Sequence, residues 1–261
     1  MIEIKKMTKV FNEGTINEKV AIADLDLKIN DGDFICIIGA NGSGKSTLLN
    51  CLSGALIPEK GNIIIDGKDV TLLSQNKRAH GIGHLFQDPL AGTAPHMSIE
   101  ENLALAAKSG QWLSTISEKD RRFFKEKLAR LDMGLEDKLS VQVATLSGGM
   151  RQALTLVMNT IKTPRLLLLD EHTAALDPET ADKVLKMTRE TIEEKKITCV
   201  MITHNMQTAI ELGNRLIMMN DGKIILDLNK EEKEKLTIDD LREMFRKRSS
   251  SELDDDRMIL S

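Results

Sequence analysis

Apolar residues occur along the chain in short runs that alternate with longer helical patterns. The short runs predict strands at residues 33–39, 61–67, 81–87, 165–170 and 197–204. Several of these runs are unbroken, which is typical of strands buried on both faces of a sheet. Residues 215–228 predict a hairpin, because Asp221-Gly222 stands between two apolar runs.

Helical patterns fill the segments between the predicted strands. Residues 43–54 read as a helix, and residues 88–146 are mostly helical, with no clear strand among them. Strands that alternate with helices imply a parallel sheet with crossover connections. The stretch 88–146 is then a helical insertion into an α/β core, and the charge-blocked residues 246–261 predict a loose polar tail.

Composition narrows the class of protein. The 261 residues suffice for one large domain, and a net charge of −4 gives no basic footprint for nucleic acid. No apolar run approaches the roughly 18 residues of a membrane span, and the start lacks the apolar core of a signal peptide. Cys36, Cys51 and Cys199 lie in apolar segments without metal-ligand spacing, which predicts buried thiols. We therefore expect a soluble cytoplasmic protein.

The stretch GANGSGKST, residues 39–47, joins a predicted strand to a predicted helix and matches G-x-x-x-x-G-K-[ST]. Its glycines let the backbone close around phosphates, and the helix N-terminus adds a positive dipole. We expect Lys45 to reach the β- and γ-phosphates and the Ser46 hydroxyl to bind Mg²⁺. The predicted nucleotide-binding residues of this loop are Gly39, Ala40, Asn41, Gly42, Ser43, Gly44, Lys45, Ser46 and Thr47.

Polar side chains end three of the predicted strands. Asp170 would hold Mg²⁺ through water, and Glu171 would polarise the attacking water. The alternative is that both acids cap the next helix, which starts near Asp177-Pro178. Strand ends beside a phosphate loop line the ligand crevice, so we predict a γ-phosphate contact for His204 and place Gln87 at the same edge. A purely structural polar strand end is the alternative for these two residues.

The stretch LSGGM, residues 146–150, begins a helical pattern with two glycines, each of which costs roughly 1 kcal/mol relative to alanine. Ser147 and the amides of Gly148 and Gly149 would form a second phosphate-binding helix start. Since the first loop already holds the triphosphate, a second set of donors is useful when it closes over the γ-phosphate. It could belong to the same chain or to a second copy across a two-fold interface, and the spacing leaves both open.

Taken together, these motifs resemble the nucleotide-binding subunit of an ATP-binding cassette (ABC) transporter over residues 1–245. The matching motifs are the Walker A loop 39–47, the Q-loop at Gln87, the signature 146–150, Walker B 165–171, the D-loop 174–177 and the switch histidine His204. The resemblance implies an α/β P-loop NTPase fold of the ABC ATPase type. It implies a RecA-like parallel-sheet core, an antiparallel β subdomain and a helical subdomain inserted at about residues 88–160.

The resemblance also implies the cofactors and the roles of residues. ATP is bound with Mg²⁺, for which Ser46, Gln87 and Asp170 are the expected metal residues. Glu171, His204 and Gln87 are the expected catalytic residues. An aromatic side chain near the N-terminus stacks on adenine in the family, and Phe11 stands at that place; a core phenylalanine is the alternative.

The family implies that two copies, or a copy and a paired ATPase subunit, meet head to tail when ATP is bound. In that dimer Ser147, Gly148 and Gly149 cover the ATP that Lys45 of the other copy holds. Two residues depart from the family pattern. Met150 replaces a glutamine and cannot donate a hydrogen bond from its side chain, and His172 replaces a proline. We interpret His172 as a packed surface histidine; the alternative is that it tunes the neighbouring Glu171.

Further partners follow from the same resemblance. The chain would work at the cytoplasmic face of the membrane, bound to integral membrane permease subunits and linked through them to a substrate-binding protein. Residues 86–106 would line the docking groove. The stretch LSVQVAT before the signature lacks the acids common in exporters, which favours an importer, similar to those for amino acids such as tryptophan or tyrosine. The alternatives are a soluble ABC ATPase of translation or DNA repair and a nucleotide sensor without turnover.

Overall fold

The computed structural model describes residues 1–88, 90–108 and 115–247. The polar tail predicted at 246–261 therefore lies outside the described residues from 248 onward, and so does Pro89. The chain divides into two compact units, each described by itself below. The first unit combines Met1–Arg78 with Val200–Ser261, and the second unit is Ala79–Cys199.

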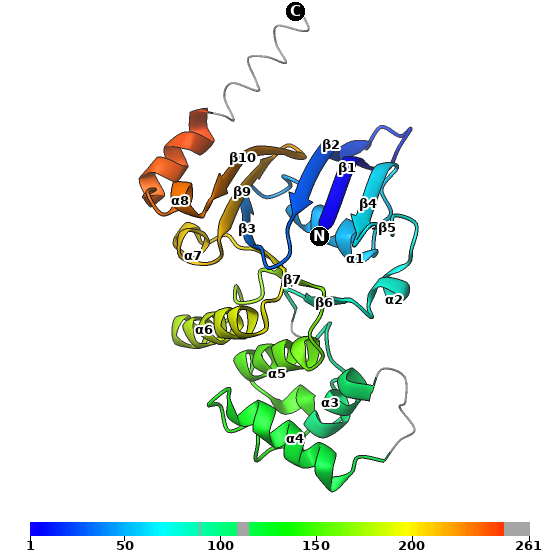
Figure 1. The fold of residues 1–261 in the computed structure, drawn as a ribbon, viewed down its shortest axis with the longest axis vertical. Helices are drawn as coiled ribbons and strands as arrows, with labels where there is room; N and C mark the ends of the chain where they lie inside the picture. Colours follow the sequence, from blue (N-terminus) through cyan, green and yellow to red (C-terminus); the bar gives the residue numbers. More distant parts are fainter. Residues whose placement is uncertain (89, 109–114, 248–261) are drawn as a thin grey trace, which may run out of the picture. The chain divides into compact units, whose positions relative to one another are not determined.

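An antiparallel sheet lies at the start of the first unit (Figure 1). Its strand order is β2-β1-β4-β5. The strands are β1 (Ile2–Phe11), β2 (Lys19–Ile29), β4 (Lys60–Ile65) and β5 (Lys68–Asp69). Alternate residues at the start of β1 are buried, because one face of the sheet packs on the core and the other meets water. This sheet is the antiparallel subdomain that the family resemblance implies.

A second set of strands in the first unit forms the core. β3 (Phe34–Gly39) runs parallel to β9 (Arg215–Asn220), which pairs antiparallel with β10 (Lys223–Asn229). The turn between β9 and β10 has positive φ at both Asp221 and Gly222, 43° and 76°, which suits a tight hairpin and confirms the prediction. β8 (Cys199–Ile202) follows β3 in the strand order. β3, β8 and β9 are buried on both faces, and β10 is partly exposed.

The helices of the first unit are mostly short. They are α1 (Lys45–Ser53), α2 (Gln75–Arg78), α7 (Met206–Glu211), α8 (Lys230–Lys233) and a helix over 238–247. α1 follows β3 after the loop 40–44 and buries one apolar face, including Leu48 and Leu52. Gly54 ends it in the left-handed conformation, which is a common helix terminator.

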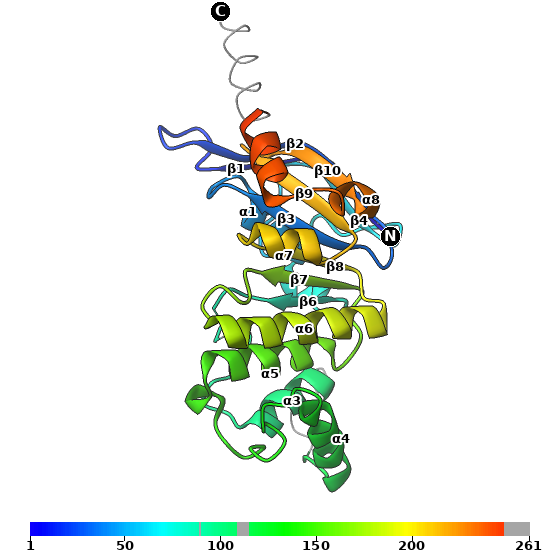
Figure 2. The same ribbon diagram turned by 90° about the vertical axis from the view of Figure 1, so that its left-hand side faces the viewer.

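The second unit is mainly helical around one pair of strands. β6 (Ile82–Leu85) and β7 (Leu166–Asp170) are parallel. The helices are α3 (Ile99–Lys108), α4 (Glu118–Ala129), the short 3-10 helix η1 (Val143–Thr145), α5 (Gly148–Thr160) and α6 (Pro178–Lys195). α5 and α6 pack side by side (Figure 2). In the described part of 88–146 the regular elements are the helices α3, α4 and η1, joined by turns and loops, which agrees with the prediction of a mainly helical insertion without a clear strand.

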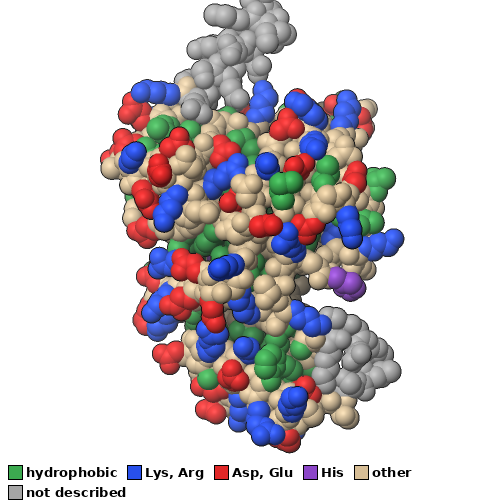
Figure 3. All heavy atoms as spheres, viewed as in Figure 1, with side chains coloured by type: hydrophobic (Ala, Val, Ile, Leu, Met, Phe, Trp, Pro, Cys, Tyr) green, Lys and Arg blue, Asp and Glu red, His purple; other side chains and the backbone are tan. Residues whose placement is uncertain are grey.

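The core of each unit is mainly aliphatic, since aromatic residues make up only 3% of the chain. In the second unit, Phe124 and Leu128 of α4 pack with α3 and α5 around Leu103 and Leu154. The three cysteines are buried and unbridged, which confirms the interpretation as structural thiols. On the face shown in Figure 3, basic and acidic side chains are interspersed over both units. Within the described residues, no helix is both long and apolar enough to span a bilayer.

Candidate nucleotide-binding site

The phosphate loop of the first unit requires glycine at the point where α1 begins. Gly44 is the N-cap of α1 and has φ 99°, a conformation that side chains disfavour. A Cβ added there would lie 2.4 Å from the carbonyl oxygen of Ala21 in β2. The backbone of β2 therefore approaches the loop so closely that only a bare Cα fits.

The loop also positions a lysine and a serine for anionic groups. The Lys45 side chain is buried, and its Nζ donates to the carbonyl oxygens of Gly39 and Ala40 at 2.9 and 2.8 Å. The Ser43 hydroxyl is buried and has no hydrogen-bond partner among the described residues. An unused buried donor is costly unless a further acceptor satisfies it. A phosphate oxygen is such an acceptor, so the loop fits a nucleotide.

His204 lies close to the same loop. It follows β8, where Thr203 N donates to Ile37 O of β3 at 3.2 Å. With Gly39 and Ala40, its exposed side chain lines a largely apolar cavity of about 230 Å³. The structure thus brings His204 beside the start of the phosphate loop. Phe245, from the helix over 238–247, lines the same cavity and was not expected from the sequence.

Phe11 ends β1 and is partly buried. The Lys9 ammonium lies 5.5 Å from the centroid of its ring and also contacts Glu59 Oε1 at 2.5 Å. The cation therefore covers one face of the aromatic ring, an attractive electrostatic contact. Phe11 is thus a half-exposed side chain at a strand end and not a fully enclosed core residue.

In the second unit, the two Walker B acids follow β7 in a strained turn. Asp170 is the last residue of β7, and Glu171 has φ 47°, which costs a non-glycine residue roughly 1–2 kcal/mol. Glu171 O accepts a hydrogen bond from Ala174 N at 2.9 Å. Asp177 is the N-cap of α6 and accepts from Thr180 N, so the cap of this helix is neither Walker B acid.

Gln87 reaches the same turn from β6. Its Nε2 donates to Oε2 of Glu171 across 3.5 Å, a long contact between two side chains at neighbouring strand ends. The second unit therefore brings together two of the three predicted catalytic residues. His204 belongs to the first unit.

The signature segment forms the start of α5. Ser147 is its N-cap, and the hydroxyl accepts from Met150 N at 3.3 Å. A Cβ at Gly149 would lie 2.1 Å from Cγ2 of Thr180 on α6, so close packing of two helices requires this glycine. Met150 packs against the helical core of the second unit. One reason for the bare backbone in this segment is therefore packing within the chain.

The surface assignment of His172 is wrong. Its side chain is 3% exposed, and Nε2 lies 3.2 Å from Oγ1 of Thr188 on α6. Burial lowers the pKa of His172 to about 4, so the imidazole is neutral near pH 7. The local sequence gave no sign of this partner, because Thr188 lies sixteen residues away on another element.

Gln152 was also missed, although it contacts both loops described above. It is fully buried on α5, and its Nε2 donates to the carbonyl oxygens of Phe86 and His172 at 3.2 and 2.6 Å. The helical pattern of α5 could have indicated that Gln152 is buried. Gln152 lies three residues after Gly149 and four before Leu156, both of which are buried.

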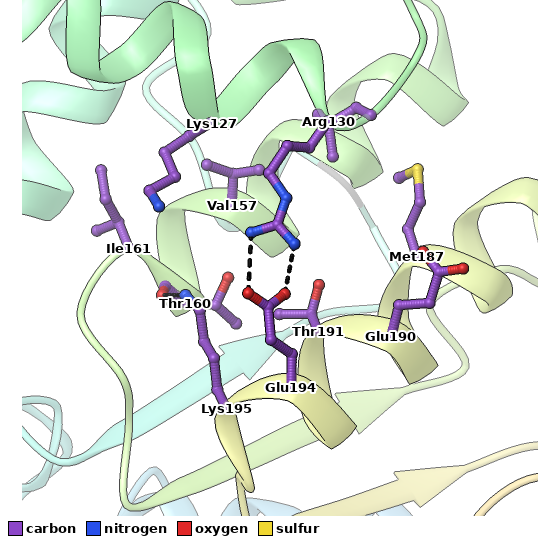
Figure 4. Close-up of a pocket in the computed structure, with 11 residues that line it drawn as sticks. Lys127, Arg130, Val157, Thr160, Ile161, Met187, Glu190, Thr191, Glu194 and Lys195 are labelled. Atoms are coloured by element: carbon purple, nitrogen blue, oxygen red, sulfur yellow. Dashed lines mark hydrogen bonds and ion pairs between the residues drawn. The ribbon is translucent and has the colours of Figure 1, made fainter.

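A smaller pocket of about 60 Å³ lies among α4, α5 and α6 (Figure 4). Arg130 forms two hydrogen bonds with the Glu194 carboxylate across it, and Lys195 donates to the Thr160 carbonyl at the end of α5. Its three basic side chains face two acidic ones, and the exposed Arg130–Glu194 pair uses one charge of each sign. We interpret this pocket as a junction between helices, without the large excess of positive charge that a triphosphate requires.

The residues predicted to bind Mg²⁺ offer oxygen ligands. Ser46 is exposed in the first turn of α1, Asp170 ends β7, and Gln87 follows β6. Within the described residues, no group of three or more His, Cys, Asp or Glu side chains could enclose a metal ion. Oxygen atoms are the ligands that Mg²⁺ prefers, and it uses one or two protein ligands beside substrate phosphates and waters.

Comparison with known proteins places this geometry in a family. A family profile described as "ABC transporter" matches residues 22–174. The chain is 40% identical over 248 residues to a tyrosine transport ATP-binding protein of Clostridioides difficile, covering 94% of this chain and 98% of that protein. It is 34% identical to a methionine import ATP-binding protein of Histophilus somni, over 86% of this chain and 64% of that one.

Solved structures agree with the sequence relatives. A dimeric ATP-binding cassette in a post-hydrolysis state, bound to ADP and Pi, superposes with a TM-score of 0.76 at 28% identity, over 88% of this chain and 99% of that chain. Fold and relatives together define a P-loop ATPase that binds and hydrolyses ATP. The chain belongs to the ABC transporter family, as an ATP-binding subunit. These relatives support the transport interpretation over a soluble, non-transport ATPase.

Proposed function

We propose that the phosphate loop of the first unit holds the ATP that this subunit hydrolyses. Lys45 would exchange its contacts with the carbonyls of Gly39 and Ala40 for the β- and γ-phosphates. The backbone amides of residues 39–47 and the buried Ser43 hydroxyl would donate to phosphate oxygens. Phe11 would offer its uncovered face to the adenine ring. The buried Ser43 hydroxyl, which has no partner within the part of the chain that the structure describes, supports this assignment.

Hydrolysis requires a water molecule aligned with the γ-phosphate and an acceptor for its proton. In our proposal, Glu171 accepts that proton, Gln87 helps to orient the water, and His204 donates to a γ-phosphate oxygen. Ser46, Gln87 and Asp170 would hold Mg²⁺. The ion neutralises phosphate charge when it is bound. The 3.5 Å contact between Gln87 and Glu171 supports a shared role for these two side chains.

We further propose that two copies, or one copy and a paired ATPase subunit, close head to tail over two ATP molecules. Ser147, Gly148 and Gly149 of one copy would cover the nucleotide held by Lys45 of the other. The exposed position of Ser147 at the start of α5 supports this arrangement. The solved ATP-binding cassette with ADP and Pi, which is dimeric, supports it too.

The transported substrate is proposed to be an aromatic amino acid, with tyrosine as the first candidate, taken up by an importer. The observation that carries this proposal is the 40% identity to a tyrosine transport ATP-binding protein across almost the full length of both chains. The subunit would bind permease subunits at the cytoplasmic face through residues 86–106. A substrate-binding protein would deliver the solute to those permease subunits.

A reconstitution experiment tests the transport proposal. The full chain is purified together with the membrane proteins that bind it, and the complex is placed in phospholipid vesicles with ATP on the side of the ATPase. We expect ATP-dependent movement of labelled tyrosine, which Glu171→Gln abolishes. Movement of labelled methionine but not of tyrosine would contradict the substrate assignment, while leaving the ATPase assignment intact.

A further inference from the structure

One buried amide contacts both of the loops that carry the proposed water-activating side chains. Gln152 is 0% exposed, and its Nε2 donates to Phe86 O at 3.2 Å and to His172 O at 2.6 Å. Phe86 directly precedes Gln87, and His172 directly follows Glu171. The two contacts therefore fix the backbone next to each of these side chains.

We propose that Gln152 is a positioning residue for ATP hydrolysis, which aligns Gln87 with Glu171 by clamping the backbone beside each of them. This inference rests on the catalytic roles given above for these two side chains. Neither side chain lies in a rigid element, because each follows the end of a strand. The hydrogen bonds from Gln152 link the two backbones, and this link keeps Gln87 Nε2 within 3.5 Å of Glu171 Oε2.

The chemistry of the clamp explains why an amide occupies this position. Both partners of Gln152 are carbonyl oxygens, which accept but do not donate, and a primary amide carries two N–H donors on one nitrogen. The Oε1 atom of Gln152 is buried and has no hydrogen-bond partner among the described residues. The side chain thus acts through its donors. A carboxylate of the same shape lacks them at neutral pH.

The segment after Glu171 is held from a second side. His172 Nε2 lies 3.2 Å from Thr188 Oγ1, and that hydroxyl donates its single proton to Val184 O at 2.8 Å. The imidazole must therefore donate through Nε2, which fixes its tautomer. With its carbonyl bound by Gln152 and its ring bound by Thr188, His172 holds the left-handed turn at Glu171, where φ is 47°.

The clamp also links hydrolysis to the signature segment. Gln152 lies five residues after Ser147 on α5, and α5 is a continuous helix from Gly148 to Thr160. A helix transmits displacement along its length, since its backbone is internally hydrogen-bonded. Any shift of the signature end of α5 therefore reaches the backbones beside Gln87 and Glu171 within the same chain.

Two substitutions in the full chain test the proposal. Gln152→Glu keeps the shape and removes both donors, and Gln152→Met keeps the volume without polar atoms. We expect kcat for ATP to fall by about tenfold to a hundredfold in each, because small misplacements of catalytic groups have effects of this size. The Kd of the monomer for ATP should stay within about twofold, since the phosphate loop is untouched.

A matched control separates positioning from helix stability. Asn159 is a second amide on α5 that binds backbone, accepting from His84 N and donating to Thr155 O, both at 2.9 Å. Asn159→Ala should lower the melting temperature while kcat stays within about twofold of wild type. Full turnover in the Gln152 variants, or an equal loss of kcat in Asn159→Ala, would overturn the clamp.

The variant Glu171→Gln separates the catalytic role proposed for Glu171 from the positioning role proposed for Gln152. If this variant hydrolyses ATP at the wild-type rate, the catalytic assignment itself fails. If it is inactive while both Gln152 variants turn over normally, the positioning role alone fails. When both assignments hold, Gln152→Met combined with Glu171→Gln is no slower than Glu171→Gln alone, because the alignment of Gln87 with Glu171 no longer contributes once the glutamate is replaced.

Discussion

The starts of α1 and α5 look alike in the sequence but differ in structure. α1 begins at Gly44 in the left-handed conformation, with no side-chain cap, and Lys45 folds back over the carbonyls of the loop. α5 begins after Ser147, whose extended backbone and hydroxyl cap the helix in the ordinary way. One helix start is shaped by backbone strain and the other by a standard capping residue.

The difference teaches that glycine serves two purposes in this chain. Gly44 supplies a backbone conformation and a close approach to Ala21, both of which a phosphate loop requires. Gly149 leaves room for Thr180 of the neighbouring helix α6. The first start has the backbone of a phosphate-binding loop, whereas the second is the surface that, in our proposal, closes over a nucleotide held elsewhere.

The largest expected effect is at the first helix start. Lys45→Ala should raise the Kd for ATP by roughly a hundredfold, because hydrogen bonds to charged groups contribute about 1.5–3 kcal/mol each. A fluorescent-nucleotide titration of the monomer measures this change. Lys127→Ala, in the helix junction of the second unit, serves as the control. Unchanged affinity for ATP in Lys45→Ala would contradict the assignment of the first helix start as the one that holds the nucleotide in the monomer.

At the second helix start, turnover should change without a change in monomer affinity. Ser147→Ala should slow ATP hydrolysis by about tenfold to a hundredfold at subsaturating ATP, and Ser147→Arg should slow it further by blocking closure. Ser117→Ala is the matched control, since Ser117 caps α4 in the same way. Steady-state ATPase rates and the Kd of the monomer for ATP, measured for each variant, show whether turnover changes without a change in affinity. An equal loss of both in the Ser147 variants would mean that the signature acts on its own nucleotide.

The packing role of Gly149 predicts a rescue. Gly149→Ala places a methyl group against Thr180 and should lower the free energy of unfolding by roughly 1–3 kcal/mol. Thr180→Ser removes the methyl group in the way and should restore most of that stability in the double variant. Gly148→Ala, which meets a flexible leucine end at 3.3 Å, should cost less. Denaturant melts compare the four chains, and absence of rescue would argue against the close approach.

The smallest effect is expected at Met150. Because its side chain packs on the helical core, Met150→Gln should change turnover by only about two- to fivefold. The steady-state ATPase rate at saturating ATP measures the change. A hundredfold gain would contradict this prediction and show that the natural methionine weakens the enzyme.

Much of this architecture was predictable from local patterns. The strands β3, β7 and β8 are short apolar runs, and the Asp221-Gly222 turn is a strong hairpin signal. β1 was not located by its pattern, because its charged residues and bulges break the alternation of apolar and polar positions. The resemblance to a family supplied the antiparallel sheet that the pattern did not.

Local patterns likewise predicted some residues of the candidate site and missed others. Motif spacing was enough to predict roles for Lys45 and Glu171, since each belongs to a segment whose chemistry is local, and these roles stay predictions. The burial of His172 and the role of Gln152 depend on residues far away in the sequence, on α6 and on the loop after β6. A pattern along one element does not reveal which distant backbone carbonyl will face a buried side chain.

The three buried thiols give this protein internal reporters of local opening. Burial raises the pKa of Cys36 on β3 to about 12 and that of Cys51 on α1 to about 11, so neither forms thiolate readily in the folded chain. Alkylating reagents react with thiolate, and their rate at each cysteine therefore follows transient exposure of that element. Because Cys51 lies on the helix that begins at the phosphate loop, a nucleotide bound there protects this thiol, and its protection reads out occupancy without any introduced label.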